Sequence, residues 1–137
     1  MPRKKHVWAI MHKGVIVAHP DTPLDEVVRV MADTGVHGLA VAEEENGPLL
    51  GTISHMDVIK YWNEDLSKYT ARDVMTPEVI SVSPDDLIED AIKVMLEHRI
   101  HRVFVVKDNR AVGVLSTTDI IREMRGSRWT WYMSVDL

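Results

Sequence analysis

The sequence predicts an α/β (α+β) fold made of two β-α-β-β-α repeats, packed through their sheets with pseudo-twofold symmetry. Three observations predict it. An internal repeat runs through the chain in a nearly constant register, and each copy carries strand and helix patterns in the same order. The chain of 137 residues, 45% of them hydrophobic, suffices for one small globular body. Each copy of about 50–60 residues buries too little surface to be comfortably stable alone.

The composition excludes several classes of protein. With 27% charged and 45% hydrophobic residues the chain is typical of a globular protein and not of a disordered one. No apolar run approaches the roughly 20 residues of a membrane span, and no apolar stretch follows the basic N-terminus, so we expect no membrane contact and a cytoplasmic location. The absence of cysteine excludes disulfides and thiolate metal sites, and a net charge of −5 disfavours nucleic-acid binding.

The repeat appears as two aligned blocks. At an offset of 64 residues the identical pairs are Met11/Met75, Val15/Val79, Ile16/Ile80, Pro20/Pro84, Asp21/Asp85, Val30/Val94, Met31/Met95, His37/His101 and Val41/Val105. The first copy then has a longer turn, and at an offset of 62 the pairs are Gly51/Gly113, Ser54/Ser116, Asp57/Asp119 and Ile59/Ile121. We expect residues 1–64 to hold an N-terminal segment and repeat 1, residues 65–126 a linker and repeat 2, and residues 127–137 an aromatic tail.

The first strand and the first helix of each copy have clear patterns. A β-branched strand comes first, at residues 15–17 and 79–82, followed by a proline and an acidic turn. The helix is predicted by apolar residues at spacings of three and four, which are Leu24, Val27, Val28 and Met31 in one copy and Ile88, Ala91, Ile92 and Met95 in the other. We expect Thr22 and Asp86 to cap these helices, with Pro23 as a first helical residue.

Two further strands and a second helix complete each copy. Apolar runs at residues 39–42 and 49–53, and at 103–106 and 111–115, are joined by turn-forming residues and predict hairpins. The second helices are expected from Ser54 to about Asn63 and from Ser116 to about Arg125, with Gly126 as a cap. The polar segment from Glu64 to Arg72 is expected to link the copies.

Three motifs give the repeat a family resemblance. They are Asp73-Val74-Met75-Thr76 before the first strand of copy two, Gly-x-x-Ser-x-x-Asp at residues 51–57 and 113–119, and His98-Arg99-Ile100-His101-Arg102-Val103. In this order and duplication, over about residues 10–125, the sequence resembles a tandem pair of cystathionine β-synthase (CBS) domains, a Bateman module.

The resemblance implies a regulatory module that binds an adenosine-containing ligand between the repeats, most often AMP, ADP or ATP, less often S-adenosylmethionine or NAD. It implies that the ribose is bound by Asp119 and Asp57, the phosphates by Ser116, Thr118, Arg102, His101 and Ser54, and the adenine by Ile80, Ile16 and Ile100. The chemistry is sound, because a carboxylate can accept from both hydroxyls of a ribose and a guanidinium offers a fork of donors to phosphate.

Alternatives exist for these residues. Ser-x-x-Asp at a helix start is also a capping box that needs no ligand, and the two roles are compatible. Copy one has His37-Gly38 where copy two has His101-Arg102, so we expect copy two to supply the better site. The seven histidines contain no complete ligand motif, and we expect no metal.

The expected function is that of a stand-alone, non-catalytic energy sensor. It would form a homodimer and signal a bound nucleotide to a separate effector protein by a conformational change. No nucleophile elbow or Walker loop indicates an enzyme. The alternative is a protein-interaction module without a physiological nucleotide. Trp129, Trp131 and Tyr132 of the tail either fold back on the module or contribute an interface.

Overall fold

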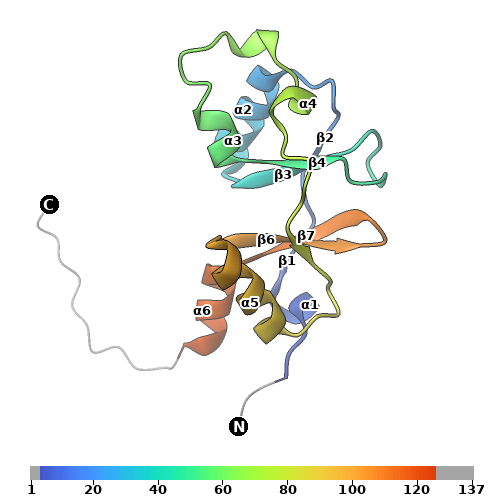
Figure 1. Ribbon diagram of the computed structural model, residues 1–137, viewed down its shortest axis with the longest axis vertical. Coiled ribbons are helices and arrows are strands. Elements are labelled where there is room, and N and C mark those ends of the chain that lie inside the picture. Colours follow the sequence, from blue (N-terminus) through green and yellow to red (C-terminus); the bar gives the residue numbers. More distant parts are fainter. Residues whose placement is uncertain (1–3, 126–137) are drawn as a thin grey trace, which may run out of the picture.

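A computed structural model describes residues 4–125, so Gly126 and the predicted aromatic tail lie outside the described residues. Two sheets face each other across the middle of the molecule, and helices cover their outer faces (Figure 1). Each half runs strand, helix, strand, strand, helix, which confirms the predicted fold class.

The first half is built on a three-stranded sheet in the order β2-β3-β4. Its elements are β2 (Val17–Ala18), α2 (Leu24–Thr34), β3 (Gly38–Val41), β4 (Gly51–Ser54) and α3 (His55–Ile59). Strand β2 runs parallel to β3, and β4 antiparallel to it. Leu24, Val27 and Met31 of α2 are buried in one core with Leu39 and Ile53 of the sheet, which confirms the predicted apolar stripe.

The second half has a four-stranded sheet in the order β1-β7-β6-β5. Its repeat elements are β5 (Ser81–Val82), α5 (Ile88–His98), β6 (Arg102–Lys107), β7 (Arg110–Ser116) and α6 (Thr117–Met124). The hairpin between β6 and β7 turns through Asp108 and Asn109, whose φ angles of 52° and 60° suit a tight hairpin turn. Ala91 and Met95 of α5 are buried in the core of this half.

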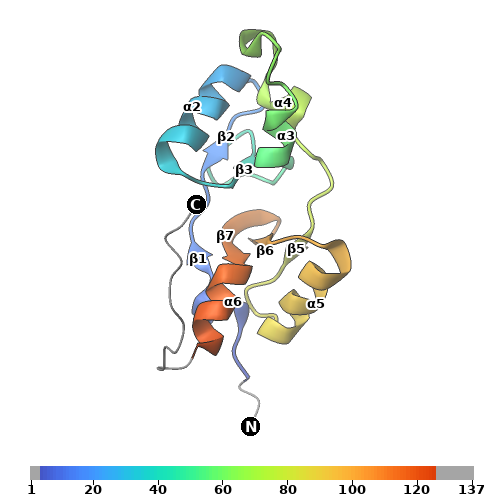
Figure 2. The ribbon, with the colours of Figure 1, turned by 90° about the vertical axis from the view of Figure 1, so that its left-hand side faces the viewer.

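The segments that precede the two repeats are exchanged between the halves. Helix α1 (Val7–Ile10) and strand β1 (His12–Lys13) belong to the second half, because β1 pairs with β7 and Val7 lies in the second core. Helix α4 (Ala71–Val74), which follows a short 3-10 turn at Leu66–Lys68, packs in the first core. The two crossing segments are seen between the sheets in Figures 1 and 2. The two helices lie 64 residues apart, so the exchange follows the repeat.

The starts of α2 and α5 correct two sequence predictions. Pro23 and Leu87 are the N-caps, so neither Thr22 nor Asp86 caps a helix and Pro23 is not a helical residue. The reason is tertiary, since the N–H of Leu24 donates to the carbonyl of Tyr69 and an isolated bridge joins Pro23 to Thr70. Extended backbone is thereby kept one residue longer than the local sequence suggests.

The second helix of the first copy is shorter than predicted. Helix α3 ends at Ile59, and tight turns continue to Glu64 because Tyr61, Trp62 and Glu64 donate their N–H groups three residues back. Helix α6 ends at Met124, close to its predicted end.

Candidate functional site

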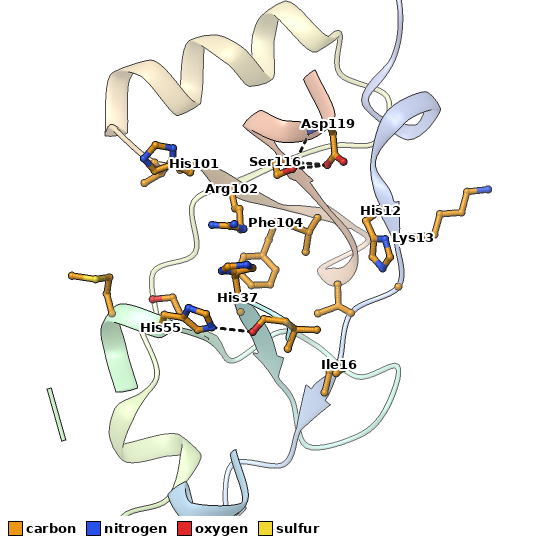
Figure 3. A pocket seen from close by; sticks show the side chains of 18 of the residues that line it. His12, Lys13, Ile16, His37, His55, His101, Arg102, Phe104, Ser116 and Asp119 are labelled. Carbon is orange, nitrogen blue, oxygen red and sulfur yellow. Dashed lines mark hydrogen bonds between the residues drawn. The ribbon is translucent and has the colours of Figure 1, made fainter. Parts of the chain in front are cut away.

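A cavity of about 660 Å³ lies between the two halves. Both halves contribute to its wall, and the lining residues are His12, Lys13, Gly14, Val15, Ile16, Val36, His37, Gly38, Ser54, His55, Met56, Arg99, Ile100, His101, Arg102, Phe104, Val114, Ser116 and Asp119 (Figure 3). They come from the segment that crosses between the halves, from the turns before β3 and β6, from the strands themselves, and from the helix starts after β4 and β7.

The structure brings most of the predicted site residues together. Those that line the cavity are Ile16, Ser54, Ile100, His101, Arg102, Ser116 and Asp119. Three predicted residues do not line it. Thr118 is exposed on α6, Ile80 is exposed just before β5, and Asp57 is held by hydrogen bonds within the first half.

Asp119 and Ser116 form a reciprocal cap at the start of α6. The Ser116 backbone N–H and its hydroxyl both donate to Asp119 Oδ2, at 2.9 Å each, and the Asp119 N–H donates to Ser116 Oγ at 3.2 Å. The capping-box interpretation is therefore confirmed. Within residues 4–125, Oδ1 of Asp119 accepts no hydrogen bond, so one carboxylate oxygen is left for a ligand.

The equivalent Asp57 is more completely engaged. Its Oδ2 accepts from the Ser54 N–H at 2.8 Å and from the Ser54 hydroxyl at 3.1 Å, and its Oδ1 accepts from Thr76 Oγ1 at 3.0 Å. The residue that corresponds to Thr76 in the other copy is His12, which forms no such bond to Asp119. The two aspartates are thus equivalent in sequence, but only Asp119 keeps a carboxylate oxygen that accepts no hydrogen bond within the described residues.

The cavity wall is rich in cationic side chains. Lys13, Arg99 and Arg102 carry a fixed charge, and none of the three forms a salt bridge or side-chain hydrogen bond with another described residue. The lining also includes four histidines, namely His12, His37, His55 and His101, and Asp119 is the one carboxylate among the lining residues. Lys13 extends outward whereas Arg102 points into the centre (Figure 3). Such a wall favours an anionic ligand.

His37 lies near the positive side chains of the cavity wall. Its pKa is lowered from the ordinary value of 6.5, first by burial and then by the neighbouring Arg102 and His55. The rings of His37 and His55 lie 4.6 Å apart between centroids, and His55 Nε2 is 3.1 Å from the Val36 carbonyl oxygen. Among the described residues no group of three or more His, Cys, Asp or Glu side chains is arranged to hold a metal ion.

Gly38, which stands where copy two has Arg102, lies close against a side chain of the other half. A Cβ atom at position 38 would lie 3.2 Å from Cζ of the Phe104 ring, which packs across the interface between the sheets. A side chain at position 38 would require the Phe104 ring to shift. Phe104 is one of the lining residues that sequence reasoning missed, because only the facing of the two sheets brings it to the cavity.

His12 and Lys13 were also missed. The sequence offered one indication of them, which is their place in the repeat. At the offset of 64 they align with Thr76 and Pro77, the last residue of the motif at residues 73–76 and the residue after it. Helical or strand periodicity gives no indication of them, because β1 contains two residues only.

Comparison with known proteins shows the same repeats. The CBS domain family matches residues 7–64 and 71–126. Inosine-5′-monophosphate dehydrogenase of Methanocaldococcus jannaschii is 33% identical over 117 residues, which are 85% of this chain and 23% of the enzyme. An uncharacterized protein of the same organism, MJ1232, is 31% identical over 89% of this chain and 38% of its own length. The chain thus spans well under half the length of these relatives.

Two solved structures with bound ligands resemble this one. CBSX2 in complex with AMP has a TM-score of 0.76 and 27% identity, covering 87% of this chain and 95% of that one. The CBS domain pair of protein MJ0100, in complex with 5′-methylthioadenosine and S-adenosyl-L-methionine, has a TM-score of 0.77 and 28% identity, covering 89% and 97%. In residues 4–125 of this chain, no helix is long and apolar enough to cross a membrane.

Proposed function

Because the chain belongs to the CBS domain family, as a pair of repeats, we propose that it is a non-catalytic regulatory module that binds an anionic adenine nucleotide, AMP, ADP or ATP, between its halves. The observation that carries the proposal is the cavity, which combines unpaired cations with one carboxylate that keeps a free oxygen. The cations suit phosphates, and the carboxylate suits the vicinal hydroxyls of a ribose.

In this proposal, Asp119 holds the ribose. Arg102, which lies opposite Ser116 in the β6–β7 register, binds the first phosphate, and His101 lies next to it. Ile16 and Ile100 supply apolar surface for the adenine. S-adenosylmethionine carries a sulfonium cation, which is repelled by this wall, so we rank it below the nucleotides.

The ligand would regulate by stabilising one arrangement of the halves. A ligand shifts a conformational equilibrium only by its difference in affinity between two states. A ligand between the halves contacts both, and any change in their relative position alters its contacts. We propose that the output is altered binding of an effector, with the module acting as a homodimer.

The proposal is tested by thermal unfolding with AMP, ADP, ATP, NAD, S-adenosylmethionine and 5′-methylthioadenosine. Nucleotides that bind the folded chain raise its melting temperature, and Asp119→Ala should remove most of that rise. The matched control is Asp57→Ala, which loses the same type of cap yet should keep the nucleotide-induced rise.

Two results would count against the proposal. If none of the compounds raises the melting temperature, the module does not sense adenosine ligands. If Asp119→Ala and Asp57→Ala diminish the rise equally, the ribose is not specifically held by Asp119.

A further inference from the structure

Arg99 has an unusual backbone conformation. It is the C-cap of α5 with φ 53° and ψ 47°, in the left-handed region, and its N–H donates to the carbonyl of Met95. Residues with a side chain rarely adopt this conformation, because Cβ crowds the following carbonyl oxygen, and glycine is the usual choice at this point of a helix end.

The repeat provides an internal comparison for this position. Gly35 is the equivalent of Arg99 at the offset of 64, and it ends α2 with φ 73° and an N–H bond to the carbonyl of Met31. The same turn is therefore made once with the favoured residue and once with a disfavoured one. A strained residue that a fold retains points to a function of its side chain.

The surroundings of Arg99 indicate which function that is. Arg99 lines the cavity, and among residues 4–125 its guanidinium has no carboxylate or hydrogen-bond partner. It lies three residues before Arg102 and two before His101. In Figure 3, His101 and Asp119 lie on opposite sides of Arg102. A nucleotide with its ribose at Asp119 and its first phosphate at Arg102 would extend its further phosphates toward the end of α5.

We propose that Arg99 binds the outer phosphates of the nucleotide and makes the cavity selective for ATP and ADP over AMP. The inference rests on the proposed function, and it adds a specificity-determining residue to it. A guanidinium can engage two phosphate oxygens at once. In the proposed arrangement the single phosphate of AMP lies at Arg102, so AMP leaves Arg99 without a phosphate partner.

The test compares AMP, ADP and ATP by isothermal titration calorimetry on the chain and its Arg99→Gly variant. The variant should bind ATP about tenfold more weakly and AMP with less than about a twofold change, because only the outer phosphates lose a charged partner. Its melting temperature without nucleotide should rise by about 2–4 °C, because glycine removes the strain.

Two further variants separate charge from conformation. Arg99→Lys keeps the charge and should retain part of the preference for ATP. Arg29→Ala removes one positive charge from the exposed face of α2, outside the cavity, and should leave the ratio of ATP to AMP affinity unchanged.

The outcomes are distinguishable. If Arg99→Gly binds ATP as tightly as the parent chain, or loses AMP and ATP affinity equally, the inference is overturned while the proposed function stands. A lower melting temperature with unchanged ATP affinity would assign Arg99 a structural role and overturn it too. If the parent chain binds none of the three nucleotides, the proposed function itself is wrong, and the role of Arg99 falls with it.

Discussion

The cavity brings a titratable side chain of the first repeat near a positive charge of the second. His37 comes from the turn before β3, and Arg102 begins β6, so one imidazole of the first half faces one guanidinium of the second. Burial and the positive neighbours Arg102 and His55 lower the pKa of His37. In the absence of an anion, proton binding at His37 is therefore disfavoured.

This arrangement predicts a pH dependence of nucleotide affinity. A phosphate placed among His37, His55 and Arg102 favours the protonated imidazole, so binding should take up a proton and tighten as the pH falls from 8 toward 6. Calorimetry in buffers of different ionisation enthalpy measures the uptake. His37→Asn should flatten the dependence, and comparison with this variant cancels the titration of the phosphate itself. Equal pH dependence in both proteins would contradict the role of His37.

The stability of the unliganded protein has the opposite dependence on pH. The pKa of His37 in the folded chain lies below the value of 6.5 expected for the unfolded chain. The unfolded chain therefore binds more protons, and the contribution of His37 to stability is present above about pH 6.5 and is lost as the pH falls through the folded-state pKa. The contribution of His37 to stability thus falls in acid, whereas its contribution to phosphate binding rises.

At the scale of elements, the exchange of α1 and α4 ties the two halves together. Val7 of α1 is 0% exposed in the second core, and Val74 of α4 is 3% exposed in the first. Neither half is complete without a segment that belongs by sequence to the other. We therefore expect the described part of the chain to unfold as one cooperative unit.

Truncation of the exchanged side chains tests this expectation. Val7→Ala should lower the free energy of unfolding by about 2 kcal/mol, because it deletes buried methyl groups and leaves a cavity. Denaturant unfolding followed by circular dichroism should still show a single transition, shifted as a whole. Leu96→Ala, at a side chain 74% exposed on α5, is the control and should change stability by less than about 0.5 kcal/mol. Separate unfolding transitions for the two halves would contradict the prediction that the exchanged segments make them one cooperative unit.

The exchange also shows where sequence reasoning stops. The apolar stripes of α2 and α5 span three turns each, and their periodicity predicted both helices. The helices α1 and α4 have four residues each, too few for a period, so their packing partners could not be predicted. The same contacts shift the start of α2 by one residue, because Leu24 bonds to Tyr69 near the start of α4.

The residues of the candidate site also differ in whether the sequence could predict them. Ser116, Asp119 and Arg102 stand in motifs that the duplication makes visible, and the structure places all three on the cavity. Phe104 and Lys13 reach it only because the sheets face each other and β1 joins β7, which are long-range contacts. Motifs thus predicted these three lining residues, although Asp57 and Thr118 of the same motifs lie off the cavity. Tertiary packing supplied the lining residues that have no local signature.

At the scale of the whole molecule, one side carries exposed apolar residues in repeat-related positions. Ile59 and Trp62 follow the start of α3, and Ile121 and Met124 occupy the equivalent places in α6. Their exposed fractions are 61%, 87%, 62% and 76%. Helices α3 and α6 lie on the same side of the molecule, which faces the viewer in Figure 2. We call this surface, defined by these four residues, the α3–α6 face.

The α3–α6 face leads to a prediction about the homodimer that we propose. A twofold axis between two copies of the chain brings identical surfaces together. Because the apolar residues of α3 are repeated in α6, α3 of one copy can pack against either α3 or α6 of the other. The double variant Ile59→Glu/Ile121→Glu should weaken dimerisation at least about a hundredfold, because each interface would bury four unpaired carboxylates. Size-exclusion chromatography with light scattering gives the mass of each species.

The control for this experiment is Leu96→Glu, which adds a charge at an equally exposed apolar residue on α5, outside the α3–α6 face. It should leave the dimer intact. A double variant that dimerises like the parent chain would place the interface elsewhere.

Nucleotide titrations of the same variant then decide whether assembly and binding are coupled. Since α6 begins at the Ser116–Asp119 cap and exposes Ile121 two residues later, a ligand that reorients this cap would move the interface, and the monomeric variant should then bind with altered affinity.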